Sequence, residues 1–347
     1  MRISFWDKWK GVAIIAVVLI HASGSTANFP VGTLNNNFGI ILRQFINFPV
    51  GLFIFLAAFF VANSKSLSES YWNSVKTRVW RLGLPFLIWS FIYFGMRMAR
   101  SNLIFADIPL MLLNGTSVSV GYFVIVMIQI SIISPFLERL NVATLTKLLP
   151  LSLLVSICAT YTLNVILTES IWSEFPYSAL PFFIWLPFYI GGIIFGKKGE
   201  DFWLSIKVWQ AFAAYLVFVC LSLAEAMLVF EDTRSLATSQ LKVTSMLTTG
   251  TVCILIFSSW VYGKDKEGNL LSWIGQRSFY FYLSHMLILW KVKYFLDKFT
   301  VLYDNQVIFV LIVTFITLGI RKGLMVPSLK GTVVDHGFNC QKMSLTY

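Results

Sequence analysis

Charged residues are scarce in this chain. Asp, Glu, Lys and Arg together make up 12% of its 347 residues, against about 25% in an average soluble domain. Hydrophobic residues reach 57%, and the mean hydropathy is +0.75. This lack of charge excludes an ordinary water-soluble domain and predicts an integral membrane protein.

Cysteine and histidine are also rare, and neither forms a metal-binding pattern. The four cysteines show no Cys-x-x-Cys spacing, and Cys158, Cys220 and Cys253 lie inside apolar runs. Thiols in such runs usually pack as small hydrophobic residues. The sequence therefore predicts no disulfide framework and no metal site.

Acidic residues are few, so the formal net charge is +11. If the apolar runs cross the membrane alternately, 19 of the 27 Lys and Arg residues fall on the side of the N-terminus. Positive residues stay on the cytoplasmic side, so we expect both termini to be cytoplasmic and the number of spans to be even. This bias, with attraction to anionic membrane lipids, accounts for the charge without a nucleic-acid partner.

Long apolar runs recur along the whole chain, and a transmembrane helix needs about 20 such residues. Ten runs come near this length: 12–24, 40–62, 82–96, 120–137, 148–167, 178–196, 203–229, 245–262, 274–292 and 306–320. The stretch 103–113 is shorter, which suggests an interfacial or re-entrant segment. We therefore expect an all-α polytopic membrane protein with about ten transmembrane helices. Residues 1–327 would form one domain, and 328–347, with His336, a loose cytoplasmic tail.

The first run resembles a signal peptide in length, but no clear small-x-small cleavage site follows it. We therefore read it as the first helix. Lys10 and His21 are eleven residues apart, which is about three turns, so they share one stripe of that helix, about 16 Å apart. A histidine this deep must face a bundle interior or a wet cavity. It is either a structural hydrogen-bonding group, with Lys10 extending to the interface, or a proton acceptor.

Two further clusters carry ionisable groups. Ser278, Tyr282 and His285 share one helical face, where His285 either bonds a neighbouring helix or serves in chemistry. Lys76, Arg78 and Arg81 crowd the predicted cytoplasmic end of the third span. They are either ordinary positive-inside residues or a pocket for phosphates, which paired guanidinium groups bind well.

Taken together, these stretches resemble acyltransferase family 3, bacterial inner-membrane enzymes that acylate cell-surface sugars. Lys10 and His21 match its basic residue, ten residues, histidine pattern. Arg78 and Arg81 match its Arg-x-x-Arg, with Pro85 after it, and "SWIGQRSFYFYLSHMLIL" resembles its late segment. The second helix has Ala57-Ala58 where the family usually has Ser-Gly, and the middle helix starts at Tyr122, where tryptophan is common.

The resemblance implies transfer of an acyl group, most simply acetyl from acetyl-CoA, to a hydroxyl of a cell-surface polysaccharide such as O-antigen, or of a lipid-linked sugar. It implies His21, Lys10 and His285 as catalytic residues and Arg78, Arg81 and Lys76 as ligands of the coenzyme phosphates. The alternatives are a transporter or flippase of lipid-linked sugars, another histidine-dependent membrane acyltransferase, and a membrane protein without chemistry. The second lacks its Asn/Asp-His pair here, and the third leaves the Lys10–His21 stripe unexplained.

Overall fold

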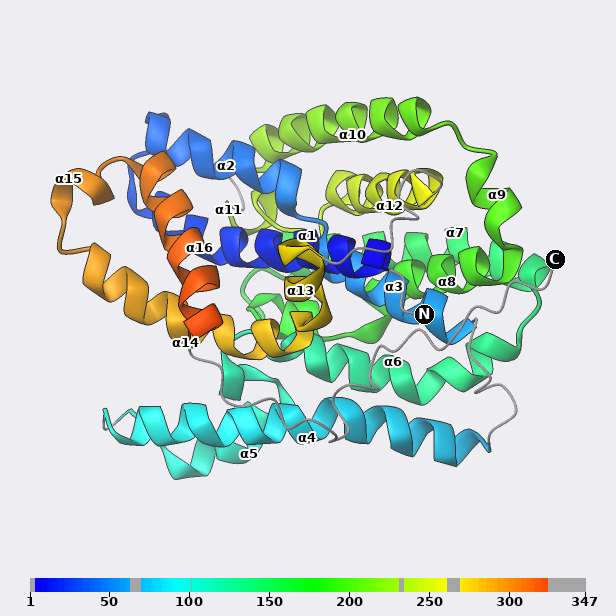
Figure 1. Ribbon diagram of the computed structural model, residues 1–347, viewed down its shortest axis with the longest axis horizontal. Coiled ribbons are helices and arrows are strands. Elements are labelled where there is room, and N and C mark those ends of the chain that lie inside the picture. Colours follow the sequence, from blue (N-terminus) through cyan, green and yellow to red (C-terminus); the bar gives the residue numbers. More distant parts are fainter. Residues whose placement is uncertain (1–3, 63–69, 101, 231–233, 261–268, 324–347) are drawn as a thin grey trace. The chain divides into compact units, whose positions relative to one another are not determined.

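The computed structural model describes residues 4–62, 70–100, 102–230, 234–260 and 269–323. The expected tail 328–347, with His336, lies outside these residues. All regular elements in the described ranges are helices, and no strand occurs among them (Figure 1). The predicted all-α class is therefore confirmed.

The described residues divide into two compact units, which we call the contiguous unit and the split unit. The contiguous unit comprises residues 50–207, and the split unit combines residues 4–49 with 208–323. The first and last parts of the chain thus fold together.

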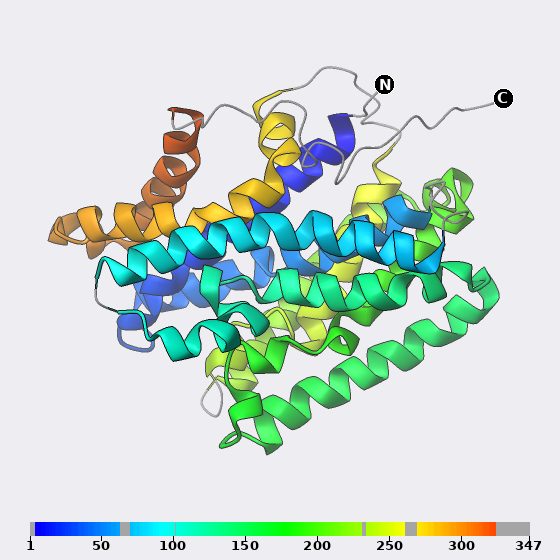
Figure 2. The same cartoon turned by 90° about the horizontal axis from the view of Figure 1, so that it is seen from below.

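The contiguous unit is a bundle in which α4 packs against α6, and α8 packs against both α6 and α7 (Figure 2). Its α-helices are α3 (Pro49–Ala62), α4 (Tyr71–Met98), α5 (Ile108–Leu113), α6 (Tyr122–Arg139), α7 (Val142–Tyr161), α8 (Phe182–Lys198) and α9 (Glu200–Leu204). Gly192 allows α8 to approach α3 closely, because a Cβ atom there would lie 2.2 Å from the carbonyl oxygen of Phe55. This contact explains the small residue at that place.

The split unit is organised around its first helix, which packs against α13, α14 and α16. Its α-helices are α1 (Ser4–Ala22), α2 (Leu34–Ile46), α10 (Val208–Val229), α11 (Arg234–Ala237), α12 (Val243–Ser258), α13 (Leu270–Gln276), α14 (Ser278–Leu296), α15 (Thr300–Tyr303) and α16 (Gln306–Gly323). A 3-10 helix, Ser23–Asn28, continues directly from α1. α10 pairs with α12 and also contacts α2.

Seven helical segments among the described residues are long and apolar enough to cross a membrane. They are Ser4–Asn28, Leu34–Ala62, Tyr71–Met98, Tyr122–Arg139, Val142–Ile166, Tyr177–Lys198 and Val208–Val229. Val243–Ser258 and Gln306–Gly319 are apolar but shorter. The expected span 274–292 is interrupted, since α13 ends at Gln276 and α14 begins at Ser278. A multi-pass membrane protein is thus supported, while the expected number of about ten spans stays a prediction.

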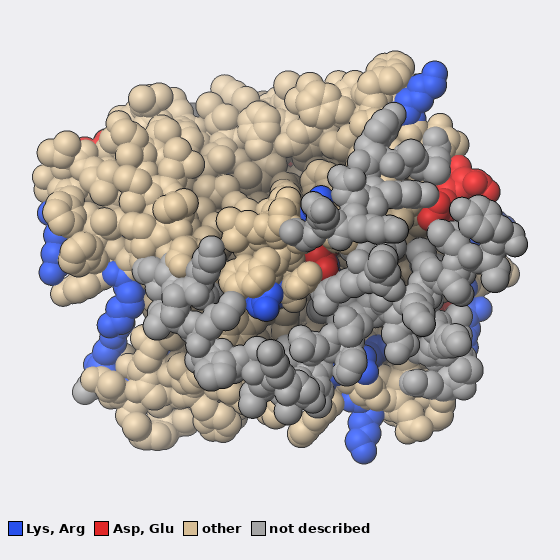
Figure 3. Space-filling view, viewed as in Figure 1, with Lys and Arg blue, Asp and Glu red and all other residues tan. Residues whose placement is uncertain are grey.

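Large apolar side chains lie on the surface of these helices. Leu228, Phe315 and Phe91 are 80%, 78% and 70% exposed. Among the described residues on the face seen in Figure 3, Lys, Arg, Asp and Glu are few. Exposed apolar side chains with so few charges beside them fit acyl chains and not water as the solvent.

Candidate active site

The candidate residues fall into two groups, one in each unit. Lys10, His21 and His285 belong to the split unit, whereas Lys76, Arg78 and Arg81 belong to the contiguous unit.

His21 and His285 meet inside the split unit, although 264 positions separate them in the chain. Their ring centroids lie 5.3 Å apart, with an angle of 43° between the ring planes. His285 is 1% exposed, and His21 is half-buried. The sequence predicted each histidine as a candidate but did not predict their contact.

The tautomer of His285 follows from its backbone contacts. Its Nδ1 atom lies 2.7 Å from the carbonyl oxygen of Tyr282 and 3.2 Å from that of Phe281. A carbonyl oxygen can only accept, so Nδ1 carries the hydrogen, and in the neutral ring Nε2 carries the lone pair. The backbone of α14 therefore fixes both the orientation of this ring and the nitrogen that can exchange a proton.

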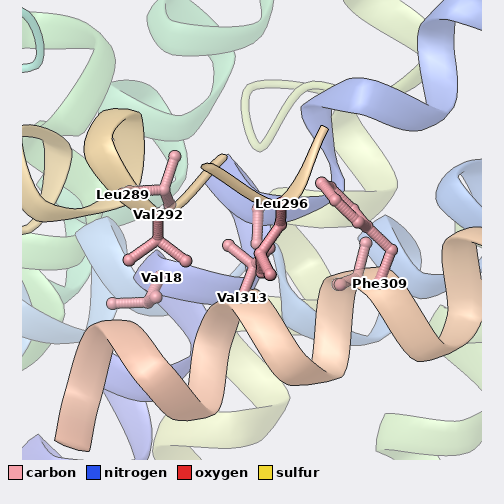
Figure 4. Close-up of a cluster of buried hydrophobic side chains, with 8 residues drawn as sticks. Val18, Leu289, Val292, Leu296, Phe309 and Val313 are labelled. Atoms are coloured by element: carbon pink, nitrogen blue, oxygen red, sulfur yellow. The ribbon is translucent and has the colours of Figure 1, made fainter. Parts of the chain in front are cut away.

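Hydrophobic packing sets the position of α14 on α1. Val18 and Ala22, which flank His21 on α1, are buried with Leu289, Val292 and Leu296 of α14 and with Phe309, Val310 and Val313 of α16. Figure 4 shows most of these side chains converging from the three helices. The packing holds the helix that carries the first histidine against the helix that carries the second.

Two cations reach the end of α1 next to His21. Arg43 of α2 donates from Nη1 to the carbonyl oxygen of Ile20 at 2.8 Å and from Nε to that of Thr238 at 3.2 Å. Lys293 of α14 donates from Nζ to the carbonyl oxygen of His21 at 3.3 Å. Sequence reasoning missed both residues, because their distance along the chain gives no sign of this contact.

Lys10 does not extend to an interface. Its Nζ atom forms an ion pair of 2.6 Å with Asp7, and both side chains are at most 4% exposed. The backbone of α13 covers this place, since a Cβ atom on Gly275 would lie 1.7 Å from the carbonyl oxygen of Asp7. Asp7 was not among the residues named from the sequence, although its i, i+3 spacing from Lys10 is typical of such a pair.

Arg78 is engaged by a buried carboxylate in the contiguous unit. Its guanidinium binds Glu138 of α6 through two contacts, of 2.5 Å and 3.0 Å, and it also donates to Ser134. The hydroxyl of Tyr189 donates to the same carboxylate at 3.1 Å, and Glu138 is 2% exposed. Arg78 thus ties α4 to α6 in a bidentate pair.

Arg81 and Lys76 lie on the same helix as Arg78, but their side chains are exposed. α4 continues through Pro85 to Met98. The three cations that the sequence placed together therefore differ in environment, because Arg78 faces a buried acid while the other two point to the surface.

Among the described residues, no group of three His, Cys, Asp or Glu side chains could hold a metal ion. The contact of two imidazoles permits proton exchange between a substrate hydroxyl and the protein.

The similarity of the chain to a known protein family indicates the class of activity to which this arrangement of histidines and cations belongs. No curated protein and no solved structure matches the chain. A family model described as an acyltransferase domain matches residues 3–320, which is nearly the whole chain. The chain therefore belongs to acyltransferase family 3.

Proposed function

We propose that this membrane acyltransferase moves an acetyl group from acetyl-CoA to a hydroxyl of a cell-surface polysaccharide or a lipid-linked sugar, in the bacterial inner membrane. The observation that carries the proposal is the contact between His21 and His285, one ring half-buried and the other locked by its own helix. Membership of the family supports acyl transfer in general. Acetyl-CoA and the sugar acceptor are the proposed donor and acceptor.

In this mechanism His21 is the general base. It takes the proton of the sugar hydroxyl while the hydroxyl oxygen attacks the thioester carbonyl carbon. The C–S bond then breaks, and the leaving sulfur of coenzyme A recovers the proton, so that the imidazole ends as it began. His285 orients His21 or exchanges the proton with it through Nε2, since its Nδ1–H is bound to the backbone.

Arg81 and Lys76 are proposed to bind the coenzyme phosphates, because their cationic groups are exposed. Arg78 is proposed to support them by holding α4 on α6 through Glu138. We propose that Lys10, whose charge Asp7 neutralises, fixes the packing and the local charge in the first half of α1, about 16 Å from His21.

The test is transfer of radiolabel from acetyl-CoA to glycans or lipid-linked sugars in membranes that contain the full chain. A general base contributes about 10² to 10⁴-fold, so His21→Ala should lose transfer by a factor of that order while its abundance in the membrane is unchanged. His336→Ala, which alters the third histidine, serves as the matched control. Full transfer by the His21 variant would contradict the assignment, and transport without any acetyl-CoA dependence would favour a flippase.

A further inference from the structure

Side chains from two other helices bind carbonyl groups near the end of α1. This helix ends at Ala22, one residue after His21, and the 3-10 helix Ser23–Asn28 continues from it. Ser23 Oγ donates to the carbonyl oxygen of Ile20 at 3.0 Å. The carbonyls of Ile20 and His21 are the ones that bind Arg43 and Lys293.

These two donors come from different helices and bind consecutive carbonyls. Arg43 is itself held by a second contact, to the carbonyl oxygen of Thr238. Lys293 stands on the helix that also carries His285, eight residues further along. The main chain at Ile20 and His21 is thus bound by one side chain from α2 and one from α14.

Lys293 is half-buried and follows Val292, which lies in the apolar cluster of Figure 4. An ammonium group with reduced access to water needs hydrogen-bond or charge partners. Lys293 has the carbonyl oxygen of His21 as an acceptor, and Asp297 of the same chain segment as an opposite charge. The contact with His21 therefore gives the ammonium group a defined position at the main chain of the proposed base.

We propose that Lys293 and Arg43 are positioning residues for His21: by binding the carbonyls of His21 and Ile20 they fix the backbone that carries the base and so aim its imidazole at His285. This inference rests on the proposed function of His21 as a base. Neither residue is assigned contact with the substrate.

The test compares three variants of the full chain in nanodiscs. Lys293→Met keeps the length of the side chain and removes the donor, whereas Lys293→Arg keeps a cationic donor. Lys291→Met removes an exposed lysine from the same helix and is the matched control. We expect Lys293→Met to lower kcat for acetyl transfer about tenfold, with KM for acetyl-CoA changed by less than about twofold. Lys293→Arg should recover most of the loss, and Lys291→Met should equal the parent chain.

A double-mutant cycle separates positioning from a general structural effect. If Lys293 acts through His21, Lys293→Met should not lower further the residual rate of the His21→Ala variant. An equal loss in both backgrounds, or an unchanged kcat in the single variant, would overturn the proposal.

A measurement that needs no activity keeps this inference separate from the identity of the donor. In protein labelled with ¹⁵N-histidine, the ring signals of His21 should shift or broaden in Lys293→Met and stay in place in Lys291→Met. If the parent chain transfers no acetyl group but these signals respond as described, the proposed donor is wrong and the positioning contact stands. Unchanged His21 signals in Lys293→Met would overturn the contact itself.

Discussion

At the scale of the residue, the two nitrogens of His285 differ in environment. Nδ1 donates to the backbone, and Nε2 is the atom that we propose to exchange a proton with His21. An asparagine places its amide nitrogen close to the position of Nδ1 and has no counterpart of Nε2.

His285→Asn therefore separates the hydrogen bond of Nδ1 from the proposed proton exchange at Nε2. If Nε2 exchanges a proton with His21, the variant should keep its melting temperature within a few degrees but lose about 10²-fold in kcat. His285→Ala should lose activity and stability together, because it removes both nitrogens. Retention of the parent rate by His285→Asn would show that the ring is only structural.

The buried ion pair of Asp7 and Lys10 makes a second prediction at this scale. Removing one partner of a buried pair leaves an uncompensated charge and costs about 3–5 kcal/mol. Lys10→Met should therefore lower stability in detergent strongly, and Lys10→Met with Asp7→Asn should recover much of it. The unfolding free energy measured by denaturant titration decides this, and equal stability of the single and double variants would contradict the pairing.

Sequence reasoning at the residue scale succeeded for local relations and failed for distant ones. Helical periodicity placed Ser278, Tyr282 and His285 on one face, and all three are buried on α14. It could not place Arg43 or Lys293 beside His21, because a contact between residues far apart in the chain depends on how helices pack. The same limit hid Glu138 as the partner of Arg78.

At the scale of the element, α4 carries two arginines in different environments, Arg78 paired with Glu138 and Arg81 exposed. Arg78→Ala should destabilise the chain, since it leaves the carboxylate of Glu138 buried without its cation. Arg81→Ala should leave the melting temperature unchanged and raise the Kd for acetyl-CoA. Titration of each variant with acetyl-CoA and measurement of its thermal unfolding check both statements. Unchanged affinity for acetyl-CoA in Arg81→Ala would mean that Arg81 serves only as a positive-inside residue.

The connection between α10 and α12 contains a fully buried lysine, Lys242. Its Nζ atom donates to Gln44 at 2.7 Å and to the hydroxyl and carbonyl oxygens of Ser222 at 2.8 Å and 2.9 Å. These contacts tie α2 and α10 to the start of α12. Burial lowers the pKa of Lys242 from 10.5 to about 8.

This pKa predicts a pH effect on the stability of these elements. Between pH 8 and pH 10.5 the unfolded chain holds the lysine proton and the folded chain does not, so this group makes the free energy of unfolding rise with pH. Below pH 8 the lysine is protonated in both states, so it adds no pH dependence to the free energy of unfolding. Melting curves at pH 7.5 and pH 9.5 should show the parent chain gaining stability relative to Lys242→Met, and a relative loss would contradict the assignment.

At the scale of the whole molecule, the sequence predicted the helical class and the membrane environment from apolar runs alone. The number of spans was harder to predict than the helical class, because the length of an apolar run does not reveal the break at Arg277 between α13 and α14. Nor did composition reveal that the chain separates into two compact units, because that division depends on long-range packing.

The orientation of the termini is testable at this scale. The distribution of Lys and Arg predicts that both ends are cytoplasmic. A green fluorescent reporter fused after Tyr347 should fluoresce, and an alkaline phosphatase fused within the 230–244 connection should be active. The opposite pair of results would mean that the chain is inserted in the inverted orientation and would place the cationic end of α4 on the wrong side for coenzyme A.

The joining of residues 4–49 with 208–323 has a consequence for biosynthesis. The first helix leaves the ribosome with Asp7 and Lys10 already able to pair, but His285, Lys293 and the glycine that covers Asp7 are translated only after more than two hundred further residues. During that interval α1 stays in the membrane without α13, α14 and α16, while the contiguous unit is inserted. Chains that stop before α13 are therefore expected to be substrates for membrane quality control, and to be degraded even though their helices are inserted.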